Sequence, residues 1–119
     1  MRSVLLVSHG SRSSKTKEEV TALAQTLKER GNIPIVEYAF LEIEVPNIPQ
    51  GISLCIAKGA TEVLVLLNFL NSGRHVNDDI PEIIRHAAEK NPQVSISMTP
   101  PVGQHSKIAD LFLDLIKNA

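Results

Sequence analysis

The chain has 119 residues, 43% of them hydrophobic, and a formal net charge of −1 at neutral pH. This length and apolar content predict one domain, residues 1–119, that folds without disulfides. The near-zero charge argues against a partner that is a nucleic acid or an anionic membrane. The single cysteine, Cys55, cannot form an internal disulfide, which favours a reducing, cytoplasmic setting. No apolar run approaches about 20 residues, so we expect a soluble protein.

The first predicted elements are a strand at 3–8 and a helix at 14–30. The strand is rich in Val and Leu without alternation, which is typical of a strand buried on both faces of a parallel sheet. The helix carries apolar residues at helical spacing. We expect Ser13 or Ser14 to cap its start and Gly31 to end it.

The same strand-then-helix pattern follows three more times. Predicted strands lie at 35–41, 62–67 and 94–98, and predicted helices at 48–58, 78–90 and 106–117. We expect the polar run 77–79 to cap the third helix, and the Pro and Gly residues at 100–103 to form a turn before the last helix.

Four such rounds, with connections too long for hairpins, predict right-handed crossovers and a parallel sheet covered by helices on both faces. The predicted class is an α/β fold of three layers, α/β/α and flavodoxin-like, with four parallel strands in the order 2-1-3-4. In that order strands 1 and 3 are neighbours whose exits lead to helices on opposite faces. Such a switch point is where ligands bind.

Three chemically active side chains follow the predicted strands 1, 2 and 3. His9 follows the strand at 3–8, Glu42 the strand at 35–41, and His75 the loop after 62–67. Imidazole suits cobalt, nickel, iron and zinc, so two histidines with open coordination positions predict an exchangeable metal ion. Glu42 is expected to act as a third ligand, a proton acceptor or an orienting partner. A loop histidine alone is more often a surface or capping group.

A polar segment, 10–15, joins the first strand to the first helix. Its hydroxyls, including that of Ser11, its backbone N–H groups and the cations of Arg12 and Lys15 suit a carboxylate or phosphate. Simple helix capping by the serines is an equally favoured interpretation, and no nucleotide-binding pattern is present. Arg74 widens the predicted positive rim.

The two remaining histidines have plainer expected roles. His105 precedes the last helix at the same sheet edge, where a capping or outer-pocket role is expected. His86 lies in the middle of the third predicted helix and is expected on the surface.

With these residues in place, the chain resembles the small, single-domain class II tetrapyrrole chelatases, that is, the sirohydrochlorin cobaltochelatase family with its nickel- and iron-inserting relatives. The resemblance covers nearly the whole chain. Four groups of residues carry the resemblance: 5–12; 39–42 together with Pro46 and 51–52; 69–76 together with 79–81; and 103–105. Ser106 departs from the family, where proline often follows the last histidine, and this weakens any transfer of function to His105.

The resemblance implies a chelatase-like fold and a lyase that inserts a divalent metal into sirohydrochlorin in tetrapyrrole or cobalamin biosynthesis. Cobalt is the favoured metal, with nickel or iron as alternatives, and the metal is a substrate with no organic cofactor. His9 and His75 would bind the metal and, with Glu42, carry catalysis. Arg12, Ser11, Lys15 and Arg74 would meet the carboxylates of the tetrapyrrole. A homodimer is expected.

Two other functions remain open. A non-catalytic carrier of metal or tetrapyrrole would use the same two histidines. A histidine-type phosphatase is less favoured, because Ser8 stands where such enzymes need an arginine before the histidine.

Overall fold

The computed structural model describes residues 1–119, apart from the side chain of His75. Four parallel strands form one sheet in the order β2-β1-β3-β4. The strands are β1 (Arg2–Ser8), β2 (Ile35–Phe40), β3 (Glu62–Leu67) and β4 (Ser95–Pro101), and the α-helices are α1 (Ser14–Gly31), α2 (Ile48–Ala57), α3 (Ile80–Lys90) and α4 (Ile108–Lys117). The predicted α/β class and strand order are confirmed.

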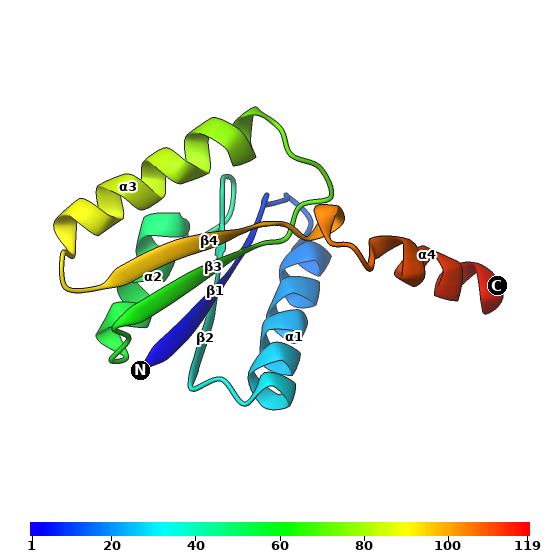
Figure 1. Ribbon diagram of the computed structural model, residues 1–119, viewed down its shortest axis with the longest axis horizontal. Coiled ribbons are helices and arrows are strands. Elements are labelled where there is room, and N and C mark those ends of the chain that lie inside the picture. The colour runs from blue at the N-terminus through cyan, green and yellow to red at the C-terminus, as the bar shows by residue number, and fades with distance from the viewer.

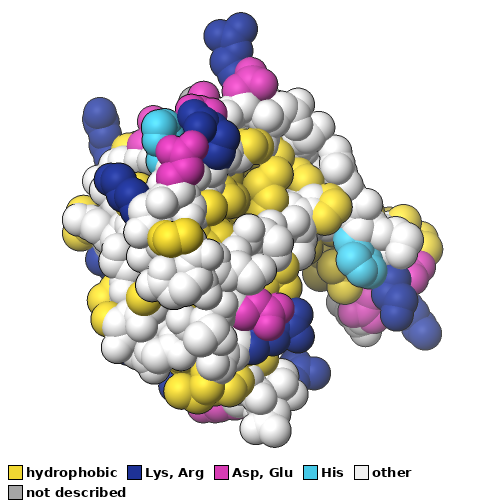
Figure 2. Space-filling model, turned by 60° about the vertical axis from the view of Figure 1, so that its left-hand side comes forward, with side chains coloured by type: hydrophobic (Ala, Val, Ile, Leu, Met, Phe, Trp, Pro, Cys, Tyr) yellow, Lys and Arg dark blue, Asp and Glu magenta, His cyan; other side chains and the backbone are white. Residues whose placement is uncertain are grey.

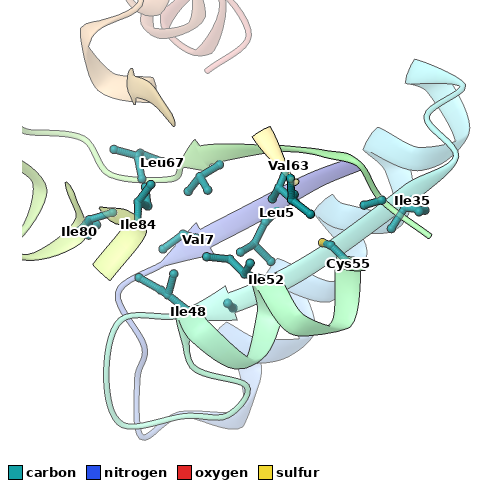
Figure 3. Close-up of a cluster of buried hydrophobic side chains, with 14 of the residues drawn as sticks. Leu5, Val7, Ile35, Ile48, Ile52, Cys55, Val63, Leu67, Ile80 and Ile84 are labelled. Atoms are coloured by element: carbon teal, nitrogen blue, oxygen red, sulfur yellow. The ribbon is translucent and has the colours of Figure 1, made fainter. Parts of the chain in front are cut away.

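The central strand β1 is buried on both faces, which explains its unbroken apolar run. Leu5 and Val7 pack in a cluster with residues of α2 and α3, whereas Val4 and Leu6 pack in a second cluster with residues of α1. Figure 1 shows α2 and α3 on one side of the sheet and α1 on the other. Figure 3 shows the first cluster.

Coverage of the α1 face is incomplete, because α4 does not pack on the sheet. Figure 1 shows α4 projecting away from the body at the end of the chain, and none of its residues is buried. Leu64 and Leu66 of β3 are therefore only half-buried on this face. The expectation that helices cover both faces of the whole sheet is wrong over β3 and β4.

The ends of several elements differ from the sequence prediction. Gly31 is the last residue of α1, and Asn32 takes the left-handed conformation there, with φ 52°. Ser13 precedes α1, but its side chain makes no capping hydrogen bond. Pro100 and Pro101 continue β4 and do not form a turn, because an edge strand tolerates residues that lack an N–H.

The start of the third helix also differs. A π-helical segment, η1 (His75–Asp79), leads directly into α3, and the side chain of Asp79 makes no capping hydrogen bond there. A short 3₁₀ helix, η2 (Val102–Gln104), precedes α4. Among the described residues, no helix is both long and apolar enough to cross a membrane.

Candidate functional site

His9 and Glu42 meet just beyond the carboxyl ends of β1 and β2. The hydrogen bonding between these strands continues past their ends, because the N–H of Leu41 donates to the oxygen of Ser8 at 2.9 Å and that of Glu42 to the oxygen of His9 at 3.0 Å. The Nε2 atom of His9 consequently lies 2.6 Å from Oε1 of Glu42. Both side chains are about half exposed, at 50% and 51%, so a ligand reaches them from solvent.

Gly10 allows this close approach of the two chain segments. Its φ is +107°, a conformation that L side chains rarely adopt. A Cβ atom at Gly10 would lie 1.9 Å from the backbone oxygen of Glu42. Glycine is therefore required next to His9 if Glu42 is to keep its position.

The exit of β3 borders the same site. The side-chain amide of Asn68 donates to Oγ of Ser8 at 3.0 Å, and its backbone N–H donates to the oxygen of Val7 at 2.8 Å. The ring of Phe69 lies against that of His9, with 6.4 Å between centroids. Sequence reasoning gave Asn68 and Phe69 no separate role, although their place after a strand next to β1 is a usable signal.

His75 was expected to join His9, but its side chain lies outside the described residues, so this pairing stays a prediction. Its backbone begins η1, where the N–H of Asn77 donates to the oxygen of Gly73 at 2.8 Å. Within the described side chains, no three His, Cys, Asp or Glu residues gather closely enough to hold a metal ion. His9 and Glu42 supply two donors.

The predicted anion-binding loop is partly occupied by the protein itself. The N–H of Ser11 donates to Oε1 of Glu44 at 2.8 Å, and the N–H of Ser13 donates to Oγ of Ser11 at 3.0 Å. These two N–H groups are therefore not available to an external anion, contrary to expectation. Sequence reasoning missed Glu44, because nothing in its local pattern points to a contact with residue 11.

The expected basic rim is exposed. Arg12, Lys15 and Arg74 all face solvent. Across the part of the chain that the structure describes, their side chains make no hydrogen bond or ion pair. Their charges are thus not neutralised by a neighbouring carboxylate there.

The other two histidines behave as expected. Nδ1 of His105 accepts a hydrogen bond from the backbone N–H of Lys107 at 3.0 Å, which caps the turn before α4. His86 is exposed on α3, with its Nε2 3.2 Å from Oε1 of Glu82.

The sequence model of the CbiX protein family matches residues 3–119. The chain belongs to the CbiX family. It is 35% identical to a sirohydrochlorin ferrochelatase of Priestia megaterium over 98% of this chain and 44% of that protein. It is also 38% identical to a sirohydrochlorin cobaltochelatase of the same organism, over 94% of this chain and 36% of that one. This CbiX chain therefore spans less than half the length of these two curated relatives.

A solved structure gives the same fold. The sirohydrochlorin chelatase SirB from Bacillus subtilis subspecies spizizenii, in complex with cobalt, is 32% identical to this CbiX chain, with a TM-score of 0.88. The superposition covers 98% of this chain and 50% of SirB. The expected chelatase-like fold is thereby confirmed.

Proposed function

We propose that this CbiX chain inserts a divalent metal ion into sirohydrochlorin, with the metal as a substrate and no organic cofactor. The observation that carries the proposal is the open pair of His9 and Glu42, whose Nε2 and Oε1 atoms are 2.6 Å apart. The pair places a nitrogen ligand beside a proton-accepting carboxylate at the edge of the sheet where ligands bind. The names of the relatives, ferrochelatase and cobaltochelatase, agree with it.

In this proposal His9 and His75 hold the metal ion. Two neutral imidazoles with solvent in the remaining positions bind an ion loosely, whereas a closed four-ligand cage would retain it as a structural metal. The Nε2 of His9 faces Glu42, so an ion bound at Nε2 takes the place of the proton shared with that carboxylate. Glu42 is then free to act as a ligand or as a base.

The proton balance of the reaction requires such a base. Two pyrrole N–H protons leave the tetrapyrrole as the divalent ion enters, so the ring gains two negative charges that the metal neutralises. Glu42 is half exposed, so it can accept a proton at a carboxylate oxygen and pass it to water. One of the histidines is the other candidate for this relay.

The basic rim would recognise the substrate. Sirohydrochlorin carries several carboxylates, which Arg12, Lys15 and Arg74 would meet through charge-assisted hydrogen bonds. Ser11 would contribute its hydroxyl, since its N–H already binds Glu44.

Cobalt is the favoured metal. Nickel and iron are alternatives, because imidazole and carboxylate ligands suit all three metals and the supply of each in the cell decides which one is bound. We place the reaction in cytoplasmic tetrapyrrole or cobalamin biosynthesis. A homodimer is part of the proposal, as the resemblance to the small single-domain chelatases implies.

The test is multiple turnover. Protein at a small fraction of the sirohydrochlorin concentration is mixed with Co²⁺, and the visible spectrum is followed. Conversion of many equivalents supports the chelatase. A single stoichiometric change contradicts it and supports the carrier function. A phosphatase stays disfavoured, because Ser8 stands where such enzymes need an arginine before the histidine.

A further inference from the structure

The loop after β2 presents two glutamates to the loop after β1. Oε1 of Glu42 lies 2.6 Å from Nε2 of His9. Oε1 of Glu44 accepts a hydrogen bond from the backbone N–H of Ser11 at 2.8 Å. Both contacts join residues that are 33 positions apart in the chain, so they are successive links between the same two segments. Glu42 has a part in the proposed function, whereas Glu44 has none.

A tight turn at Ile43 separates the two glutamates. The φ of Ile43 is 72°, a left-handed conformation that is strained for a β-branched residue. The N–H of Glu44 donates to the oxygen of Glu42 at 2.8 Å, which closes a three-residue turn of a rare, strained kind. From the α1 side, Nζ of Lys17 donates to the oxygen of Val45 at 2.9 Å. Such strain persists only where the surroundings hold the backbone, and the contacts of Glu44 and Lys17 do so here.

The contact with Glu44 fixes the backbone beside Arg12. The N–H of Ser11 is held by Glu44, and the N–H of Ser13 is held by Oγ of Ser11 at 3.0 Å. Both neighbours of Arg12 thus donate their N–H groups to acceptors within the protein. The side chain of Arg12 is exposed, and it makes no hydrogen bond or ion pair with the residues that the structure describes. Its position is therefore set by its backbone and not by contacts of its own.

The backbone position decides what an exposed cation can reach. Figure 2 shows, for one face of the molecule, how Lys and Arg side chains extend from the surface into solvent. An arginine has several rotatable bonds, and in solvent no packing selects one rotamer. A displaced Cα atom therefore changes which carboxylates the guanidinium can meet in its two-point geometry.

We propose that Glu44 is a positioning residue: its carboxylate holds the N–H of Ser11 and so keeps Arg12 where the guanidinium meets a carboxylate of the tetrapyrrole. This rests on the proposed function, in which the tetrapyrrole is the substrate. The contact requires an acceptor oxygen at position 44 and does not require a negative charge. The charge alone would act in the opposite direction, because it would repel the carboxylates of the substrate.

The first test compares Glu44→Ala with Glu44→Gln. The dissociation constant of metal-free sirohydrochlorin is measured from its visible absorbance, and KM and kcat from cobalt insertion. Glu44→Ala removes the acceptor, so the dissociation constant and KM should rise about five- to tenfold with kcat nearly unchanged. Glu44→Gln keeps an acceptor oxygen, so both should stay within about threefold of the unmodified chain. Glu19→Ala, which removes an exposed carboxylate of α1, is the control.

Three results of this comparison overturn the proposal. They are unchanged binding by Glu44→Ala, an equal loss in both Glu44 variants, and tighter binding by either of them, which would show repulsion of the substrate. Binding of the metal-free tetrapyrrole does not depend on turnover. A chain that shows the expected pattern of binding but inserts no metal would therefore contradict the proposed function and leave the role of Glu44 in place.

A double-mutant cycle tests whether Glu44 acts through Arg12. With Arg12→Gln already present, Glu44→Ala should raise the dissociation constant by less than about twofold more. With Arg74→Gln present, Glu44→Ala should keep its full effect, because Arg74 lies on the loop after β3. A full effect of Glu44→Ala in the absence of Arg12 overturns the proposal.

The last test observes the contact itself. NMR spectroscopy follows the exchange of the Ser11 amide proton with water in the protein alone. Because Glu44 accepts the hydrogen bond of this proton, Glu44→Ala should accelerate its exchange about tenfold or more, and Glu44→Gln should do so less. Glu19→Ala should leave the exchange unchanged. An exchange rate that is the same in Glu44→Ala and in the unmodified chain overturns the proposal.

Discussion

The Nε2 atom of His9 lies 2.6 Å from Oε1 of Glu42, although the two residues are 33 positions apart in the chain. The parallel register of β1 and β2, which pairs Ser8 with Phe40, brings them together. Gly10 lets the two exits touch. The backbone of the sheet thus positions the proposed metal ligand, His9, and the proposed proton acceptor, Glu42. Both side chains lie outside the hydrophobic core, so replacing either should leave the fold intact.

Replacing Glu42 tests the role of its charge. Glu42→Gln keeps the size of the side chain but removes the base and a ligand oxygen, so we expect cobalt insertion to slow by about 10- to 100-fold. The rate is followed by the visible spectrum of the tetrapyrrole. Glu62→Gln is the control, since Glu62 is an exposed carboxylate at the opposite end of β3. Equal rates for the two variants would remove Glu42 from the mechanism.

Two glycines test the close contact beside His9. Gly10→Ala forces a side chain into a positive φ and against the oxygen of Glu42, so it should lower the free energy of unfolding by about 3 kcal/mol or more. Gly73→Ala meets nothing within 4 Å and should change stability by no more than about 0.5 kcal/mol. Urea unfolding measures both. A small effect of Gly10→Ala would mean that the loop relaxes freely.

Cys55 gives the stability a pH dependence. Burial raises the pKa of its thiol above the ordinary value of 9.0. The folded state thus favours the neutral thiol, and the stabilisation is complete below the unfolded pKa and is lost as the pH rises through the folded pKa.

Unfolding free energies at about pH 8 and about pH 10 should therefore fall more steeply for the unmodified chain than for Cys55→Ala. The variant is less stable at both pH values because of its cavity, so only the slopes are compared. Parallel slopes would show that the thiol ionises to the same extent in the folded and unfolded states, so that burial does not raise its pKa.

The basic rim is tested through substrate binding. Arg12→Gln removes a cation at the proposed carboxylate contact, so KM for sirohydrochlorin should rise about tenfold with kcat nearly unchanged. Arg30→Gln, in the last turn at the far end of α1, is the control. A fall in kcat alone would contradict a role in binding and would place Arg12 nearer the reacting atoms.

The sequence predicted those parts of the fold that depend on local patterns. The unbroken apolar run of β1 predicted a strand buried on both faces, and the regular alternation of strand and helix predicted a parallel sheet. The order 2-1-3-4 was an assumption about that sheet, and the structure confirms it. The exits of adjacent strands then identified His9 and Glu42 as neighbours. A parallel sheet brings such exits to one edge, so their proximity follows from topology.

Other features depend on contacts that no local pattern reveals. The hydrogen bond from the N–H of Ser11 to Glu44 joins two loops that are 33 residues apart in the chain. It forms only because the backbones of both loops take particular conformations. The apolar stripe of α4 correctly predicted a helix. The same stripe could pack on the sheet of this chain or on that of another copy, and the pattern does not distinguish the two. Hydrophobic periodicity predicts which face of a helix is apolar, but it does not identify the surface on which that face packs.

The central claim is that His9 holds the metal ion that is inserted. Its most direct test is the initial rate of cobalt insertion into sirohydrochlorin by His9→Ala, with His86→Ala, an exposed histidine on α3, as the control. We predict a fall of about 100-fold or more for His9→Ala, with unchanged circular dichroism, and an unchanged rate for His86→Ala. A folded His9→Ala variant that inserts cobalt as fast as the His86→Ala control would contradict the account.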